Sequence, residues 1–119
     1  MNGSLVIIPT YNERENVVRM LEMVMALAFP FDVLVVDDGS PDGTAALVKE
    51  TQALHPQRIH LLERKGKLGL GTAYIAGFRW GLERGYNFIF EMDCDFSHNP
   101  EDLVRLRDAC AEGGAGMSV

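Results

Sequence analysis

Four short segments typical of strands, separated by segments with helical spacing, constrain the fold of this chain most. The first, residues 5–8, is continuously apolar, which is typical of a strand buried on both faces of a parallel sheet. Between the four segments, apolar side chains recur every three or four residues, which predicts helices. The predicted strands are residues 5–8, 32–36, 58–63 and 87–91, and the predicted helices are residues 13–28, 44–54, 72–83 and a fourth from about 100. This alternation predicts an α/β fold, a parallel sheet with helices on both faces.

Local signals suggest where these helices begin and which side chains they bury. Asn12 is a candidate N-cap for the first helix, with Glu15 three residues later as in a capping box, and Asn99 can cap the fourth. The second helix is expected to turn five side chains inward: Ala45, Leu47, Val48, Thr51 and Leu54. His55 and His60 belong to no recognisable pattern, so we expect both at the surface.

Size and charge limit the classes of protein to consider. The 119 residues are sufficient for one domain with a single core. The net charge of −6 argues against a nucleic-acid-binding protein, which would carry a basic stripe. No apolar run approaches 18 residues and no signal-peptide pattern is present, so we expect no membrane span. Cys94 and Cys110 lack metal-ligand or disulfide spacing, which favours a reduced, cytosolic setting.

Polar segments follow all four predicted strands, at residues 9–13, 37–43, 64–71 and 93–97, and the second and third of them are rich in glycine. Ligands of open parallel sheets bind outside the carboxyl ends of the strands. We therefore expect these four segments to lie along one edge and to form the site.

Asp93 and Asp95 are the strongest chemical signal among these segments. Residues i and i+2 of an extended chain point to the same side, so the two carboxylates are expected to face one small volume. Two close carboxylates need a cation, a shared proton or open water. Mg²⁺ typically binds one or two carboxylates together with phosphate oxygens. The alternative for an isolated Asp-x-Asp is a solvated acidic loop.

The other segments leave alternatives open. In residues 37–40, a carboxylate can accept hydrogen bonds from a base or ribose, or the segment is simply a turn that caps the next helix. The basic loop 64–71 can offer N–H groups and cations to phosphates, although its glycine spacing matches neither the dinucleotide fingerprint nor Walker A. Tyr11 can stack on a nucleobase or pack against the protein.

Taken together, four motifs resemble family 2 glycosyltransferases, and more narrowly the polyprenol (dolichol) phosphate mannosyltransferases. They are Pro-Thr-Tyr-Asn-Glu at 9–13, Val-Asp-Asp-Gly-Ser-Pro-Asp-Gly-Thr at 36–44, Lys-Leu-Gly-Leu-Gly-Thr-Ala-Tyr at 67–74 and Met-Asp-Cys-Asp-Phe-Ser-His-Asn-Pro at 92–100. The resemblance covers nearly the whole chain. It implies the nucleotide-binding half of a GT-A fold, with residues 1–119 as the N-terminal part of one domain whose acceptor-binding part is absent.

The resemblance also implies a reaction and a set of residues. The donor would be GDP-mannose, the acceptor a polyprenyl (dolichyl) phosphate, and the cofactor Mg²⁺ or Mn²⁺. The enzyme would be peripheral at the cytoplasmic face of the membrane. The resemblance does not decide whether the protein forms a homo-oligomer. Asp95 would be the more direct metal ligand, with Asp93 beside it, and both would be catalytic. Cys94 stands where alanine is common, and Ser97 where some relatives have a metal-binding glutamine. The residues implied to contact the donor are Pro9, Tyr11, Glu13, Val36, Asp38, Asp93, Cys94 and Asp95.

Three other functions compete with this one. A related enzyme would use a UDP-sugar, because neither base nor sugar can be read from these residues. A phosphate-responsive signalling domain also carries acidic residues after parallel strands, but it would be expected to have a lysine on a strand end after Asp93, which is absent. The third alternative is a fragment that only binds a partner.

Overall fold

A central parallel sheet with helices on both faces organises the chain. The computed structural model describes residues 3–27, 30–65, 70–92 and 103–105. Its strands are β1 (Ser4–Thr10), β2 (Asp32–Asp37), β3 (Ile59–Glu63) and β4 (Phe88–Glu91). They pair in the order β3-β2-β1-β4, and every pairing is parallel. The predicted parallel α/β sheet is confirmed.

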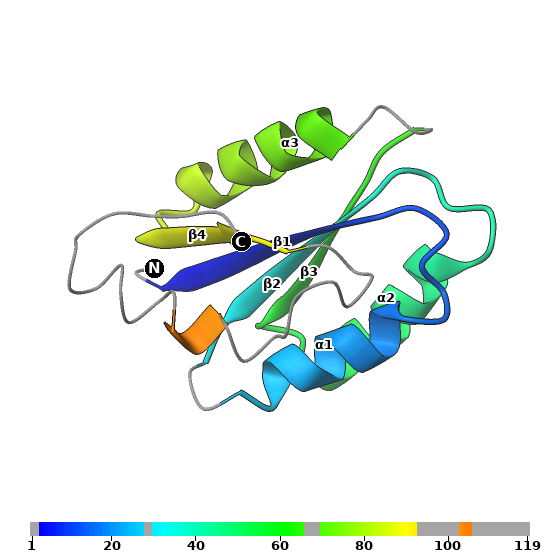
Figure 1. The fold of residues 1–119 in the computed structure, drawn as a ribbon, viewed down its shortest axis with the longest axis horizontal. Coiled ribbons are helices and arrows are strands. Elements are labelled where there is room, and N and C mark those ends of the chain that lie inside the picture. The colour runs from blue at the N-terminus through cyan, green and yellow to red at the C-terminus, as the bar shows by residue number, and fades with distance from the viewer. Residues whose placement is uncertain (1–2, 28–29, 66–69, 93–102, 106–119) are drawn as a thin grey trace.

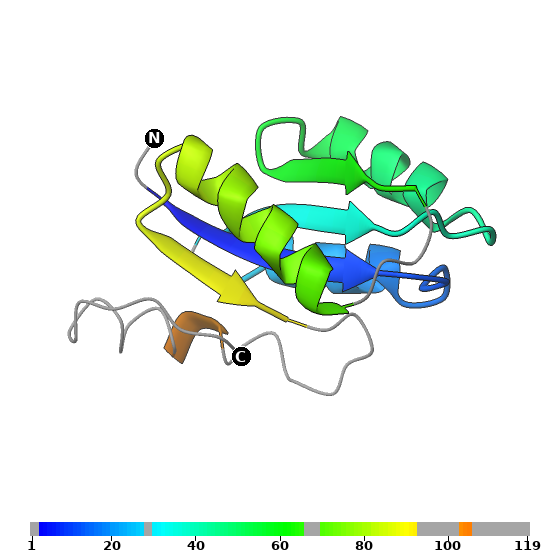
Figure 2. The ribbon, with the colours of Figure 1, turned by 90° about the horizontal axis from the view of Figure 1, so that it is seen from above.

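The helices divide between the two faces of the sheet (Figures 1 and 2). They are α1 (Val17–Met25), α2 (Thr44–Leu54) and α3 (Leu70–Glu83). Figure 1 shows α1 and α2 below the sheet and α3 above it. Residues 103–105 are also helical, and Leu103 packs into the core on the α1 side.

Strand β1 has no exposed face, which explains its uninterrupted apolar sequence. Val6 and Ile8 belong to the core between the sheet and helices α1 and α2, whereas Leu5 and Ile7 belong to the core between the sheet and α3. All four side chains are fully buried. The alternation follows from the two-residue period of a strand, and it places β1 at the centre of the molecule.

Two glycines let α3 lie very close to the sheet. A Cβ on Gly77 would be 2.7 Å from the Ile7 Cγ2 atom, and one on Gly81 would be 2.9 Å from atoms of Leu5 and Ile89. Ala73, one turn before Gly77, is also buried. Small residues every four positions therefore set the distance between α3 and strands β1 and β4.

The predicted start of the first helix is wrong. The helix begins at Val17, and Asn16 occupies the cap position without a side-chain capping bond. Asn12 is not an N-cap, because it lies in the left-handed region at φ 55° and its N–H donates to Ser40 Oγ. The N–H groups of residues 12–14 are all bonded to the loop after β2, so they do not need the capping box.

Two further expectations need correction. Leu54 is 72% exposed, because the buried stripe of α2 follows Thr44, Val48 and Thr51 and the last residue lies off it. His60 is not a free surface residue: its ring centroid is 5.0 Å from that of Trp80. Burial lowers the pKa of His60, against the opposing effect of the Asp32 carboxylate.

His60 is part of an aromatic group that attaches the end of α3 to the amino ends of the strands. The rings of Trp80 and Tyr86 stack with centroids 6.2 Å apart, and the Arg84 guanidinium lies 3.8 Å from the Trp80 ring centroid. The Tyr86 hydroxyl donates to Asp32 Oδ2 at 2.7 Å. Burial, followed by this bond, raises the pKa of Tyr86. The group joins α3, β2 and β3 at the end of the sheet opposite the predicted site.

Replacing Gly77 by alanine should destabilise the fold. The added methyl group would overlap Ile7, and overpacking of this kind costs about 1–3 kcal/mol. Gly71→Ala is the matched control, since a Cβ at position 71 meets no atom within 4 Å and alanine favours a helix. Urea unfolding measures both free energies, and equal stability of the two variants would contradict the close packing.

Candidate functional site

The strand order reverses between β1 and β4. The chain passes from β1 to β2 and β3 on one side, and β4 then pairs with β1 on the other side. Such a reversal is where open α/β sheets bind ligands. Figure 2 shows all four arrowheads pointing to the same side. The expectation that the strand ends share one edge is confirmed for the described residues.

The chain reaches this reversal at the residue before Asp93. Strand β4 ends at Glu91, and the N–H of the buried Met92 donates to the Ile7 carbonyl oxygen of β1 at 3.0 Å. Asp93, Cys94 and Asp95 come next in the sequence but lie outside the described residues. Their donor and metal roles stay predictions.

Pro9 and Val36 lie side by side in the sheet but differ in exposure. They are register partners in β1 and β2. Pro9 is partly exposed at the edge, whereas the Val36 side chain is fully buried in the core beneath α3. The Val36 side chain therefore lies inside the core and is not exposed at the edge of the sheet.

Asp37 is buried and holds the edge together. Its carboxylate accepts hydrogen bonds from Thr10 Oγ1 at 2.7 Å, Ser40 Oγ at 2.6 Å and the Ser40 N–H at 3.0 Å. Only 1% of the residue is exposed. Buried carboxylates need such partners, so Asp37 has the structural role that the sequence left open for residues 37–40.

Asp38 is paired with Arg64, an interaction that the sequence analysis missed. Arg64 Nε lies 2.7 Å from Asp38 Oδ1, and Nη2 lies 3.0 Å from Oδ2, which is a bidentate pair. The Asp38 side chain is only 8% exposed and the Arg64 side chain 12%. Arg64 Nη1 also donates to Thr72 Oγ1 of α3 at 3.1 Å. The predicted base- or ribose-binding carboxylate is therefore held in a fixed direction.

A register argument could have found this pair. Asp37 and Glu63 are partners in the parallel ladder of β2 and β3, so the residues that follow them leave the sheet together. In the sequence, Arg64 is recognisable only as part of a basic loop that can offer cations to phosphates. Its side chain contacts Asp38 after β2 and Thr72 of α3.

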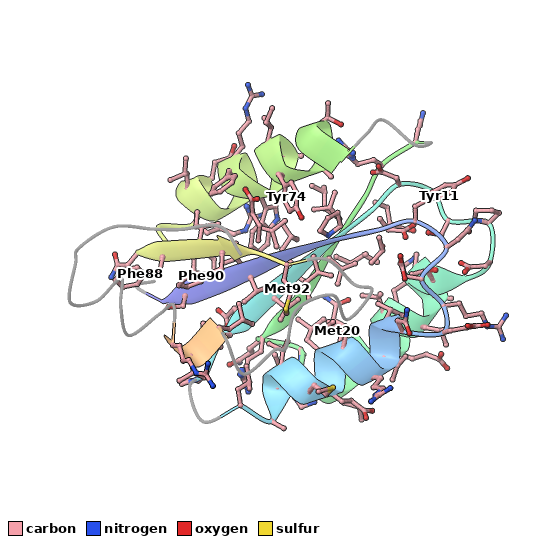
Figure 3. The ribbon with its side chains drawn as sticks, viewed as in Figure 1. Tyr11, Met20, Tyr74, Phe88, Phe90 and Met92 are labelled. Carbon is pink, nitrogen blue, oxygen red and sulfur yellow. The ribbon has the colours of Figure 1, made fainter. Side chains whose placement is uncertain are left out.

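Tyr11 and Glu13 lie on the loop after β1. Tyr11 is 36% exposed, and Figure 3 shows it beyond the carboxyl end of β1, away from the core residues Met20, Phe90 and Met92. Glu13 is half-buried, and Asn16 Nδ2 donates to its Oε2 at 3.4 Å. An aromatic ring and two carboxylates, Glu13 and Asp38, thus line the described part of the edge.

Asp42 lies in the loop after β2, two residues before the start of α2. The Thr44 hydroxyl and N–H both donate to its Oδ1, and Oδ2 accepts the Arg14 N–H at 3.2 Å. The bond from the Thr44 hydroxyl is the largest of the causes that lower the pKa of Asp42 below its ordinary value of 3.8. The carboxylate therefore acts as an acceptor for two loops at neutral pH.

Within residues 3–27, 30–65, 70–92 and 103–105, no group of three or more His, Cys, Asp or Glu side chains is arranged to hold a metal ion. No helix in the same ranges has the length and apolar character needed to cross a membrane.

The fold and the edge together define the class of protein. A parallel β3-β2-β1-β4 sheet, with carboxylates at the carboxyl ends and a strand reversal, is the nucleotide-binding architecture of GT-A glycosyltransferases. The sequence pattern described as "Glycosyl transferase family 2" matches residues 5–119. The chain therefore belongs to glycosyltransferase family 2, which confirms the predicted family and fold.

Two curated relatives are similar over most of this chain. A "Polyprenol monophosphomannose synthase" of Mycolicibacterium smegmatis is 53% identical over 116 residues, which is 98% of this chain and 43% of the relative. An "Undecaprenyl-phosphate mannosyltransferase" of Micrococcus luteus is 54% identical over 105 residues, 88% of this chain and 43% of the relative. The chain thus spans less than half the length of either relative.

Solved structures share the fold. A mannosyltransferase from Pyrobaculum calidifontis in complex with GDP-Man and Mn²⁺ superposes with a TM-score of 0.61 and 31% identity, over 65% of this chain and 24% of that one. S. aureus TarS in complex with UDP-GlcNAc superposes with a TM-score of 0.74, over 92% of this chain and 31% of that one. At 24% identity, the second likeness concerns the fold alone.

Breaking the Asp38–Arg64 pair should reveal strong coupling. Each single change, Asp38→Asn or Arg64→Met, leaves a largely buried partner without its counterpart, while the double variant removes both charges. We expect a coupling energy of about 1–3 kcal/mol in a double-mutant cycle measured by urea unfolding. Additive effects of the two changes would show that the pair is not a fixed element of the site.

The acid titration of Asp42 should depend on Thr44. The pKa of Asp42 is lower in the folded state than the unfolded value of 3.8. This contact therefore stabilises the fold fully when the pH is above the unfolded-state pKa, and the stabilisation is lost as the pH falls through the folded-state pKa. In Thr44→Val, the pKa of Asp42 should rise toward the ordinary value, since the largest cause of its lowering is removed. Carboxyl ¹³C shifts followed by NMR measure it, and an unchanged pKa would contradict the contact.

Proposed function

We propose that the full-length protein transfers mannose from GDP-mannose to a polyprenyl phosphate. The observation that carries this proposal is the identity of 53% and 54% with two relatives named for mannosyl transfer to polyprenol lipids. The Pyrobaculum calidifontis mannosyltransferase in complex with GDP-Man supports the choice of donor. Because this chain spans 43% of each relative, the activity is proposed for the whole protein.

The edge of the sheet binds the nucleotide in this proposal. Tyr11 offers an exposed ring for a base, and Asp38 offers acceptor oxygens for base or ribose donors. A carboxylate has about four acceptor positions, so the pair with Arg64 leaves Asp38 able to accept further hydrogen bonds. Pro9 and Glu13 complete the proposed contacts of the donor on this side, whereas the fully buried Val36 supports the edge from within the core.

Asp93 and Asp95 would hold Mg²⁺ or Mn²⁺, with Asp95 the more direct ligand. The described carboxylates at the carboxyl end of β2 have other partners: Asp37 accepts from Thr10 and Ser40, and Asp38 pairs with Arg64. Two carboxylates are a suitable donor set for a hard divalent cation that also binds phosphate oxygens. When bound, such a cation neutralises charge on the leaving diphosphate.

The acceptor needs no general base. A phosphate monoester is already ionised at neutral pH, so its oxygen can attack the anomeric carbon directly. A new bond forms between this oxygen and the anomeric carbon as the bond to GDP breaks, and in-line attack inverts the configuration to give a β-linked mannosyl phosphate. The protein contributes mainly by positioning the donor and stabilising charge.

The lipid acceptor places the reaction at a membrane surface. We assign the enzyme to the cytoplasmic face as a peripheral protein, where the phosphate of a polyprenyl lipid meets a nucleotide-sugar. The likeness to TarS with UDP-GlcNAc concerns the fold, so it does not favour a UDP-sugar donor. Membership in glycosyltransferase family 2 argues against a signalling domain.

Donor choice and transfer test the proposal. We expect the full-length protein with Mn²⁺ to bind GDP-mannose more tightly than UDP-glucose in isothermal titration and to transfer mannose to a polyprenyl phosphate. Tighter binding of UDP-glucose would overturn the assignment of the donor, and no transfer to any polyprenyl phosphate would overturn the assignment of the reaction.

A variant of Asp95 completes this test. Asp95→Asn should lower turnover by about 100-fold or more without loss of folding, because it removes a charge at the diphosphate rather than core packing. Glu22→Gln, an equivalent change at an exposed position of α1, is the control and should leave turnover unchanged. Normal turnover of Asp95→Asn would exclude the proposed metal role.

A further inference from the structure

Three consecutive N–H groups of the loop after β1 are bonded to side chains of the loop after β2 and of the first residue of α2. The donors and acceptors are far apart in the sequence, so these bonds tie two separate segments together, and Arg14 Nη1 also donates to the Asp42 carbonyl oxygen at 3.4 Å. Asn12 N–H donates to Ser40 Oγ at 2.8 Å, Glu13 N–H to Thr44 Oγ1 at 3.1 Å and Arg14 N–H to Asp42 Oδ2 at 3.2 Å. We name the three acceptor residues, Ser40, Asp42 and Thr44, the loop latch.

Neighbouring carboxylates orient the two hydroxyl groups of the latch. The Ser40 hydroxyl donates its proton to Asp37 Oδ1 at 2.6 Å, and the Thr44 hydroxyl donates to Asp42 Oδ1. A hydroxyl group has one proton and two lone pairs. With the proton directed to a carboxylate, a lone pair is available for the N–H of the opposite loop. The hydroxyl groups of the latch are therefore oriented as acceptors for the opposite loop.

The latched loop has an unusual backbone conformation. Asn12 has a φ of 55°, a region that residues other than glycine seldom occupy, although asparagine tolerates it better than most. Immediately after it, the Glu13 carbonyl accepts the N–H groups of Asn16 and Val17 and so begins the turn into α1. The bonds to the latch thus fix a backbone that local preferences alone would not select.

This loop carries two residues of the proposed donor site. Tyr11 immediately precedes the three latched N–H groups, and Glu13 supplies one of them. The directions of the Tyr11 ring and the Glu13 carboxylate therefore depend on where the latch holds the backbone. We propose that Ser40, Asp42 and Thr44 are positioning residues, which hold Tyr11 and Glu13 in place for the donor nucleotide. This inference rests on the proposed function.

Thr44 provides the sharpest test, because α2 contains a matched control. Thr44→Val in the full-length enzyme should raise the KM for GDP-mannose about five- to tenfold, the typical effect of one lost hydrogen bond, with kcat within about twofold of the parent. Thr44→Ser keeps the hydroxyl and should restore the parent KM. Thr51→Val removes a second buried hydroxyl of α2, which donates to the Leu47 carbonyl at 3.1 Å away from the loop, and should leave the KM unchanged.

Hydrogen exchange gives a readout that does not depend on activity. The Glu13 amide should exchange faster in Thr44→Val than in the parent and in Thr51→Val, because its acceptor is lost. Unchanged exchange at Glu13, or an equal rise of the KM in Thr51→Val, would overturn the positioning role.

Titration of the parent with GDP and UDP distinguishes this inference from the proposed function. Weaker binding of GDP than of UDP would contradict the assignment of the donor. In that case, an unchanged affinity of Thr44→Val for UDP would overturn the latch, and a weakened one would support it.

Discussion

Asp37 joins three strands, through its buried carboxylate and its main-chain carbonyl, at the edge where the nucleotide is proposed to bind. Its side chain accepts the Thr10 hydroxyl at the end of β1 and the Ser40 hydroxyl in the loop after β2. Its carbonyl oxygen accepts the Arg64 N–H just after β3. An unsatisfied buried carboxylate is costly, so we expect the loss of one of these contacts to weaken the others. The positions of the Asp38–Arg64 pair and of the latch both depend on this one residue.

Adjacent aspartates thus have different roles that their sequence does not distinguish. Asp37 and Asp38 point to opposite sides of an extended chain, so one faces Thr10 and Ser40 while the other faces Arg64. Asp37 has its acceptor oxygens engaged within the protein. Asp38 is held by a cation in a nearly buried position and keeps acceptor capacity for a ligand. This difference supports a structural role for the first and a binding role for the second.

The elements could be predicted from the sequence because their signals are local. Uninterrupted apolar runs define β1 and β2, and the common edge follows from parallel strands. The start of α1 could not be predicted, because the acceptors for the N–H groups of residues 12–14 lie about thirty residues later in the sequence. The partial burial of His60 could not be predicted for a similar reason: its neighbour Trp80 belongs to α3, which is distant in the sequence and packs over the sheet. Of the candidate site, the described residues fell on the expected edge, whereas the pairing of Asp38 with Arg64 depends on strand register.

Packing in the core and geometry at the site are linked through α3. Gly77 and Gly81 bring this helix against Ile7, Leu5 and Ile89, so its position over the sheet has little freedom. The first turn of the same helix carries Thr72, whose hydroxyl accepts a bond from Arg64 at 3.1 Å, and Arg64 in turn holds Asp38. A side chain at either glycine would lift the helix and move Thr72 away from this arginine. The glycines therefore contribute to the direction of the Asp38 carboxylate as well as to the density of the core.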